Sequence, residues 1–230
     1  MKDKLNTTLL GLGYKARNGK DSVANFLNKK LKDVQILHWA DGVYEECRNE
    51  NSEYPLILQE VKTESKVWYS LLDNKYTGTR RVLSHKQVPY LHKIFNYRDI
   101  TEYWKMDGKD PEILQFWGTN FRRKFCDINY WIDRTFKKIN ELPKSTKYII
   151  IPDTRFINEV EAVHNHDGLY IKVIRTNTDG SAYVANDRDP NHASEIELEN
   201  YPADFTLTAT NLIELEKEVD NFILKFINSL

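Results

Sequence analysis

The chain of 230 residues has a formal net charge of −1, with 29% charged and 12% aromatic residues. This length can bury a substantial core, and the balanced charge excludes a general electrostatic attraction to nucleic acid or to membranes. The two cysteines, Cys47 and Cys126, are too few for a disulfide framework and lack metal-ligand spacing. No apolar stretch reaches membrane-spanning length, and the N-terminal apolar run is too short for a signal peptide. We therefore expect a soluble cytoplasmic protein.

The first predicted unit is a strand, a glycine-containing loop and a helix. The apolar run from Leu9 to Leu12 is typical of a buried strand, and apolar residues at helical spacing follow Gly19 and Lys20. In this order the segment is a candidate phosphate-binding loop, in which backbone N–H groups, the helix dipole and a lysine converge on one anion. We expect Lys20 to lie between the β- and γ-phosphates of ATP, and the Ser22 hydroxyl to bind Mg²⁺.

The loop departs from the usual pattern in two places. Five residues separate Gly13 from Gly19, one more than usual, and Asp21 stands between the lysine and the serine. The alternative interpretation is a left-handed turn in which Asp21 or Asn18 caps the helix. If the loop binds ATP, its candidate ligands are Lys15, Arg17, Asn18, Gly19, Lys20, Asp21 and Ser22.

Further strands alternate with helices along the chain. Apolar runs predict strands over residues 34–39, 148–151, 169–174 and 204–208, and helical spacing predicts helices over 111–125, 129–140, 156–166 and from Asn211 onward. This alternation predicts an α/β fold, a three-layer doubly wound parallel sheet of five strands of the P-loop NTPase type. We expect one domain, with a nucleotide-binding core in 1–45 and 145–230. A mostly helical substrate-binding or lid insertion of several short helices is expected over 46–144.

The third predicted strand leads into a possible second functional segment. Its apolar run ends in Pro-Asp-Thr-Arg, which places Asp153 at the carboxyl edge of the sheet, where ligands of α/β proteins bind. Asp153 could hold Mg²⁺ or a substrate hydroxyl, and Arg155 could bind a phosphate through two hydrogen bonds. The alternative is an aspartate that caps a helix and an arginine on the surface.

Taken together, these motifs resemble the deoxynucleoside monophosphate kinases of tailed bacteriophages, a branch of the P-loop nucleoside monophosphate kinases. The resemblance rests on five short segments: Gly19-Lys20-Asp21-Ser22, Leu114-Gln115 leading to Gly118-Thr119, Tyr130-Trp131, Pro152-Asp153-Thr154-Arg155 with Glu159, and His192-Ala193-Ser194-Glu195. Residues 45–110 have no recognisable counterpart. The family's basic pair before the glutamine is replaced here by Pro111 and Glu112.

The resemblance implies transfer of the γ-phosphoryl group of ATP to a deoxynucleoside monophosphate in phage nucleotide metabolism, with Mg²⁺ as the cofactor. It implies that Lys20, Asp153 and Arg155 are catalytic, and that Arg155 and Arg122 or Arg123 hold the acceptor phosphate. The further substrate ligands it implies are Gln115, Gly118, Thr119, Trp131 and Glu159, with Trp131 stacking on the base. Arg175 and Arg188 are candidates for a lid over ATP.

Two other functions stay open at this point. One is a kinase for another small phosphorylated acceptor, because phosphomevalonate kinase of the animal type also has a Gly-Lys-Asp loop. The other is a regulatory ATP-binding protein without an acceptor site. The expected partners are small molecules rather than nucleic acid or membrane, and both a monomer and a homodimer are compatible with the resemblance.

Overall fold

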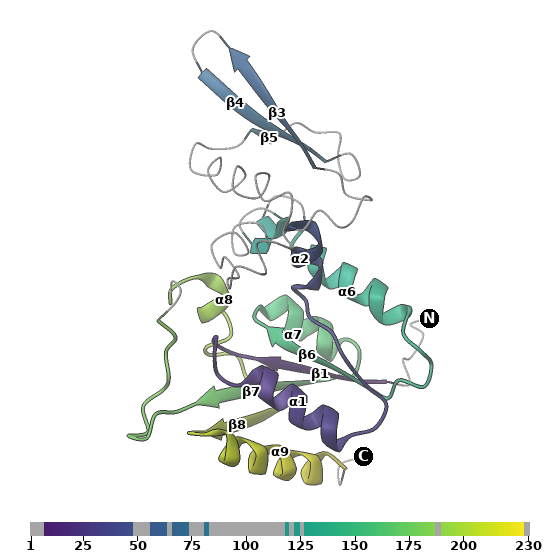
Figure 1. Cartoon of the computed structure of the whole chain (residues 1–230), viewed down its shortest axis with the longest axis vertical. Coiled ribbons are helices and arrows are strands. Elements are labelled where there is room, and N and C mark those ends of the chain that lie inside the picture. The colour runs from purple at the N-terminus through teal and green to yellow at the C-terminus, as the bar shows by residue number, and fades with distance from the viewer. Residues whose placement is uncertain are drawn as a thin grey trace. The chain divides into compact units, whose positions relative to one another are not determined.

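The computed structural model describes residues 7–47, 56–63, 66–73, 81–82, 118–119, 122–124, 127–186 and 190–227. The internal contacts of the chain divide it into two units, one made of Met1–Trp39 and Ile132–Leu230, the other of Ala40–Trp131. The helices and strands of both units are labelled in Figure 1.

A five-stranded parallel sheet forms the centre of the first unit. Its strands are β1 (Thr8–Gly13), β2 (Val34–Ile36), β6 (Tyr148–Thr154), β7 (Leu169–Arg175) and β8 (Phe205–Ala209). They lie in the order β2-β6-β1-β7-β8, and each neighbouring pair is parallel. The predicted α/β fold with a parallel sheet is therefore confirmed. The strand order reverses at β1, and ligands of open α/β sheets bind at the carboxyl ends of the strands at such a point.

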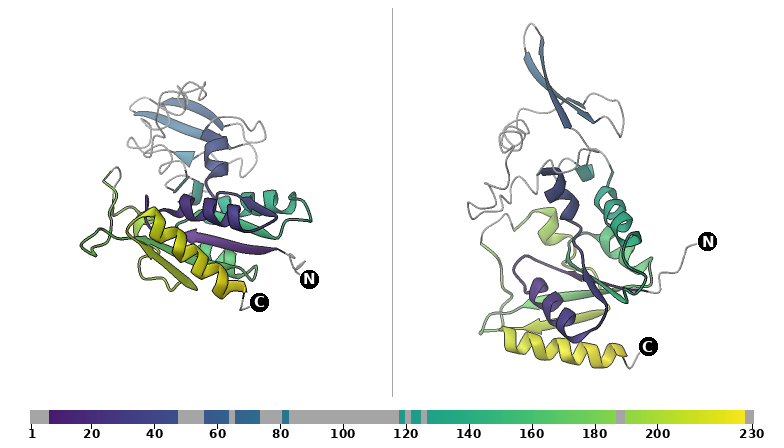
Figure 2. Two further views of the ribbon diagram at one scale, coloured as in Figure 1. Left: turned by 60° about the horizontal axis from the view of Figure 1, so that its bottom comes forward. Right: turned by 45° about the vertical axis from the view of Figure 1, so that its right-hand side comes forward.

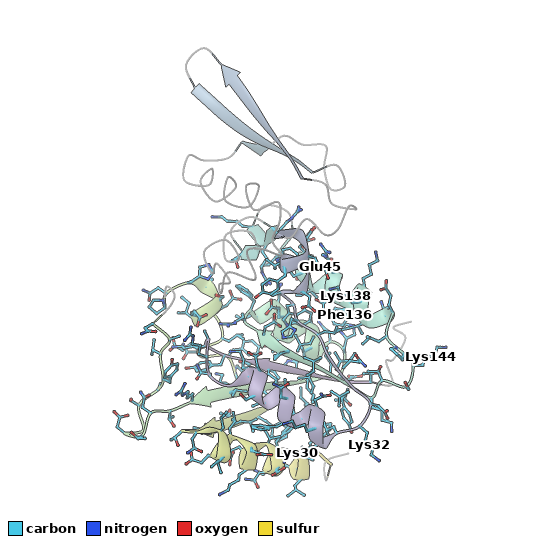
Figure 3. All side chains as sticks on the ribbon, viewed as in Figure 1. Lys30, Lys32, Glu45, Phe136, Lys138 and Lys144 are labelled. Atoms are coloured by element: carbon cyan, nitrogen blue, oxygen red, sulfur yellow. The ribbon has the colours of Figure 1, made fainter. Side chains whose placement is uncertain are left out.

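Helices α1 (Lys20–Lys30) and α9 (Leu212–Ile227) cover one face of this sheet. Figures 1 and 2 show them side by side. Their apolar stripes pack on alternate strand residues, because successive side chains of a strand point to opposite faces. Lys30, labelled in Figure 3, joins the two helices, with its Nζ 3.2 Å from Glu216 and 2.7 Å from Asp220.

Helices α6 (Tyr130–Asn140) and α7 (Ile157–His164) contribute to the core on the opposite face. Ile132 and Ile139 of α6 are buried with Leu9, Ile149 and Ile151 of the sheet. The sequence analysis assigns residues 132–144 to the insertion, whereas in the structure they belong to the unit that contains the sheet. The burial of these two isoleucines explains the difference.

The second unit contains α2 (Asp41–Cys47) and an antiparallel sheet of β3 (Leu56–Thr63), β4 (Lys66–Asp73) and β5 (Arg81–Val82). The prediction of short helices is therefore wrong for residues 56–63 and 66–73. β3 and β4 pair along their whole length across a two-residue connection, so non-local pairing outweighs the weak local pattern. The predicted helix over 111–125 lies mostly outside the described residues. Among those the structure does describe, no helix is both long and apolar enough to span a membrane.

Candidate phosphate-binding site

The loop between β1 and α1 consists of residues 14–19 and has three residues in the left-handed region. Tyr14 has a φ of 101°, Arg17 of 55° and Gly19 of 91°. At Gly19 a side chain would be strained by this φ, and its Cβ would lie 2.9 Å from Cδ2 of Leu215. Turns of this kind direct backbone N–H groups into a concavity that suits an anion. The loop lies at the carboxyl end of β1, where the strand order reverses.

Lys20, the first residue of α1, is buried, with 6% of its surface exposed. Its Nζ donates to the backbone carbonyl oxygens of Tyr14 at 3.2 Å and Lys15 at 2.5 Å. Burial, together with the charge of Arg155, holds the pKa of the Lys20 ammonium well below its ordinary value, although nearby carboxylates act in the opposite direction. No ion pair joins Lys20 to a carboxylate among the described residues. A bound phosphate would therefore neutralise a charge that the fold leaves costly.

Asn18 shapes the loop from within. Its side chain is buried, its Nδ2 donates to the carbonyl of Ala16 at 2.9 Å, and its Oδ1 accepts the backbone N–H of Arg175 at 2.7 Å. These bonds tie the loop to the end of β7. The direct contact of Asn18 with ATP stays a prediction.

The other predicted ATP ligands in and beside the loop lie nearer the surface. Lys15 Nζ is 2.8 Å from Oε1 of Glu199, and this hydrogen bond raises the lysine pKa. Arg17 and Asp21 are exposed, and Ser22 is half-buried in the first turn of α1. The positions of these residues are compatible with contact to a bound ligand.

Gly13, the last residue of β1, is packed so closely that its neighbours leave no room for a Cβ atom. A Cβ there would lie 2.5 Å from Cε2 of Tyr170 and 2.9 Å from the carbonyl oxygen of Thr154. We expect Gly13→Ala to lower the free energy of unfolding by about 3 kcal/mol, because a backbone oxygen cannot move aside cheaply. Denaturant unfolding would measure this, and an unchanged midpoint would contradict the close packing.

Asp153, near the end of β6, is half-buried and joins this strand to the segment that follows β2. Its Oδ1 accepts the backbone N–H of Trp39 at 2.9 Å, and the indole Nε1 of Trp39 donates to Oγ1 of Thr154 at 3.2 Å. Within the described residues, no group of three or more histidine, cysteine or acidic side chains could enclose a metal ion. The Asp153 carboxylate and the Ser22 hydroxyl are oxygen donors of the kind Mg²⁺ takes together with nucleotide phosphates, so their chemistry fits that ion.

Arg155 follows β6 in a turn that Glu159 fixes. Glu159 is buried, and its Oε2 accepts the backbone N–H groups of Arg155 at 2.7 Å and Phe156 at 3.1 Å. The observed bonds give Glu159 a role in the start of α7, and its predicted contact with substrate stays a prediction. The Arg155 guanidinium in turn donates through Nη1 to Oε1 of Glu195 at 2.6 Å and to the carbonyl of Ser194 at 3.2 Å.

Glu195 also belongs to the site, although it is not among the site residues predicted from the sequence. It lies in the short helix α8 (Ala193–Ile196), has 7% of its surface exposed, and accepts the backbone N–H of Ala16 at Oε2, at 2.8 Å. These two partners are 179 positions apart in the sequence. Only the His-Ala-Ser-Glu segment, one of those that carry the family resemblance, could have drawn attention to it.

Arg175 ends β7 and is exposed, and its guanidinium carbon lies 4.2 Å from the ring centroid of Tyr183. The backbone N–H of Tyr183 also donates to the carbonyl of Arg175 at 3.0 Å. These contacts hold the exposed Arg175 guanidinium at the end of β7, and the backbone N–H of the same residue is bonded to Asn18 of the loop. Arg188, the other lid candidate, lies outside the described residues.

The remaining predicted substrate ligands belong to the second unit. The indole Nε1 of Trp131 donates to the carbonyl of Gly118 at 2.8 Å, and Trp131 is 3% exposed. A Cβ on Gly118 would lie 3.3 Å from Cγ2 of Val43, so the valine side chain would have to shift slightly to admit it. Arg122 is buried, and its guanidinium carbon lies 4.9 Å from the ring centroid of Tyr130.

Contacts of these second-unit residues with a substrate stay predictions. Thr119 is half-buried. Gln115 lies outside the described residues.

Tyr170, beneath the loop in β7, is fully buried, and its hydroxyl has no hydrogen-bond partner in the described part of the chain. We expect Tyr170→Phe to change the free energy of unfolding by less than about 1 kcal/mol, because no bond is lost. Burial also raises the pKa of the phenol above its ordinary 10.0, so the unfolded chain ionises first as the pH rises. Wild-type stability should then fall above pH 10.0, and the Tyr170→Phe protein should fall less steeply. Urea unfolding of the wild type and of Tyr170→Phe at pH 8 and pH 11 would measure both effects. A large loss of unfolding free energy in Tyr170→Phe at pH 8 would contradict the finding that the hydroxyl makes no hydrogen bond.

No protein-family model matches this chain, and no curated protein matches it. Function is therefore inferred from the residues and their geometry.

Proposed function

We propose that this chain is an ATP-dependent phosphotransferase, a deoxynucleoside monophosphate kinase that converts a deoxynucleoside monophosphate and ATP to the diphosphate and ADP. One observation carries the proposal. Lys20 is buried beside the loop at the carboxyl end of β1, and Arg155, which follows the neighbouring strand β6, is joined to the same loop through the two oxygens of Glu195. Two cations held near each other without an ion pair to the lysine suit a ligand that carries several negative charges.

The donor phosphates are assigned to the loop and to Lys20. Backbone N–H groups of the loop other than that of Ala16, which donates to Glu195, and those of the first turn of α1 would hold them, with Lys20 as the full positive charge. Phosphoryl transfer demands little covalent chemistry from a protein, so positioning and charge neutralisation carry the rate. The rigid attachment of the loop through Asn18 supports this role, because a preorganised loop need not reorganise during the reaction.

Mg²⁺, when bound, would bridge phosphate oxygens and neutralise charge that develops during transfer. Ser22 and Asp153 are the residues assigned to hold it. Asp153 already uses Oδ1 for the Trp39 N–H, which fixes the orientation of its carboxylate. Hydrogen bonds to a metal-ligating carboxylate orient the ligand in many metal sites.

The acceptor phosphate and the phosphoryl group in transit are assigned to Arg155. Its Nη1 is held by Glu195 and Ser194, which leaves the other N–H groups of the planar guanidinium to bind the phosphate in this proposal. Arg122, Gln115, Gly118, Thr119, Trp131 and Glu159 are the further acceptor ligands that the family resemblance suggests. Arg175 is proposed to close over ATP and exclude water, which would limit wasteful hydrolysis.

Base dependence separates this proposal from the two alternatives. With γ-labelled ATP and Mg²⁺, the protein is expected to label a deoxynucleoside diphosphate, and the yield should depend on the base of the acceptor. A phosphomevalonate-type kinase would label an acceptor that has no base. A regulatory ATP-binding protein would bind ATP and label none of the acceptors, which would contradict the proposal.

A further inference from the structure

We propose that Glu195 is a positioning residue that couples the loop to Arg155, so that both point to the same phosphate-binding position. The inference rests on the proposed function for its effect on turnover, but its effect on ATP binding can be measured separately. Nothing in the family resemblance or in the roles assigned above gives this residue a task.

The two oxygens of one carboxylate make the coupling. Oε2 accepts the N–H of Ala16 in the middle of the loop at 2.8 Å, and Oε1 accepts from Nη1 of Arg155 at 2.6 Å. Both bonds involve a charged group, and the carboxylate is buried, where such bonds are strongest. A change in the position of Glu195 would therefore move the loop and the guanidinium together.

The segment that carries Glu195 is itself anchored to the unit that contains the sheet. The His192 side chain caps α8 by accepting the N–H of Ser194, and Leu198 is buried in a cluster with Val160 and Tyr170. A further tie follows in the chain, because Nζ of Lys172 donates to the carbonyls of Glu199 at 3.1 Å and Tyr201 at 2.9 Å. These contacts fix the position of the segment that carries Glu195.

A different role for the same carboxylate would be to occupy the place of a phosphate until ATP displaces it. The position of Lys20 argues against this role. A phosphate in the loop is expected to meet the Lys20 ammonium, yet among the described residues Lys20 makes no ion pair with Glu195, and its Nζ bonds instead to two loop carbonyls. Glu195 therefore lies beside the candidate phosphate position and supports it from outside.

Two substitutions separate the functions of the two oxygens. In Glu195→Gln an amide oxygen can still accept the Ala16 N–H, but the charge facing Arg155 is lost, whereas Glu195→Ala removes both bonds. Glu197→Ala is the matched control, because Glu197 is an exposed carboxylate in the same segment that also accepts a backbone N–H, that of Ile157 at 2.8 Å.

The test is calorimetric titration of the full-length chain with Mg²⁺–ATP, combined with acceptor-dependent turnover and thermal unfolding. We expect Glu195→Ala to weaken ATP binding by about 10- to 100-fold, the contribution of one hydrogen bond to a charged group. Glu195→Gln should keep more of the ATP affinity but raise the acceptor KM. Glu197→Ala should keep both. At saturating ATP, the Glu195→Ala, Arg155→Ala double variant should turn over no more slowly than Arg155→Ala alone, because the bond to Arg155 is already absent, whereas its ATP affinity should still be lower, because the bond to Ala16 is lost as well.

The inference would be overturned if Glu195→Ala bound ATP as tightly as the wild type or more tightly. It would also be overturned if the control Glu197→Ala lost as much ATP affinity as Glu195→Ala. If the Glu195→Ala protein does not fold, unchanged ATP affinity and acceptor KM in Glu195→Gln would overturn it. A wild-type protein that binds ATP but uses no acceptor would refute the proposed function alone, since the ATP titrations would still decide the role of Glu195. A wild-type protein that binds no ATP would refute both.

Discussion

Replacement of Lys20 by alanine is expected to lower acceptor-dependent ADP formation by about 10²- to 10³-fold, the effect of losing one preorganised group that stabilises developing charge. The protein should remain folded. Burial and the nearby charge of Arg155 already disfavour the ammonium, so its removal relieves an electrostatic cost. The substitution also removes the hydrogen bonds of Nζ to the carbonyls of Tyr14 and Lys15, which offsets this gain. The expected result is a large loss of turnover with an unfolding temperature close to that of the wild type, measured by a coupled ADP assay and by calorimetry.

Lys29→Ala is the matched control for this result, because Lys29 lies in the last turn of the same helix and is exposed. It should retain wild-type turnover and ATP affinity. If Lys20→Ala and Lys29→Ala both turned over at the wild-type rate, Lys20 could not be the phosphate ligand and the loop would be a structural turn.

Replacement of Arg155 by alanine is expected to lower turnover by about 10³-fold, comparable to the loss of an arginine that stabilises a transferring phosphoryl group. ATP affinity should fall much less, since the loop and Lys20 remain. The removal also breaks the ion pair of the buried Glu195 carboxylate with Arg155, while its bond to the Ala16 N–H remains. We therefore expect a lower unfolding temperature in addition to the loss of turnover.

Arg155→Lys distinguishes geometry from charge. A lysine keeps the positive charge but cannot offer the planar pair of donors, so it should recover the unfolding temperature more fully than the turnover. Equal recovery of both would indicate that Arg155 acts only through its ion pair with Glu195. Unchanged turnover in Arg155→Ala would contradict its assignment to the reaction.

The sheet and the loop could be predicted from sequence because their signals are local. The apolar run of β6 is buried on both faces, and such a run is legible without knowledge of its neighbours. The same holds for β1, the loop and α1, which are consecutive, so that Gly19 and Lys20 could be placed before the fold was known. The reversal of strand order at β1 then brought Asp153 and Arg155 toward the lysine.

The other features depend on contacts that are distant in sequence. β3 and β4 are not predicted from the sequence because their apolar residues are interspersed with charges, and their regular pattern lies in the pairing of one strand with the other. Glu195 bonds to Ala16, 179 positions away in the sequence, and to Arg155, 40 positions away, and no local pattern predicts such contacts. Likewise, no local pattern predicts that the Asn18 side chain accepts the backbone N–H of Arg175, and its contact with ATP stays a prediction.

The central claim is that the loop and Arg155 serve phosphoryl transfer to a deoxynucleotide. The most direct test is ADP release from Mg²⁺–ATP in the presence of each deoxy- and ribonucleoside monophosphate in turn, with Lys20→Ala as the control. The account predicts ADP formation that requires a deoxynucleoside monophosphate, differs between bases and falls by about 10²- to 10³-fold in the variant. Tight ATP binding with no acceptor-dependent ADP release would contradict it and leave a regulatory nucleotide-binding protein as the better description.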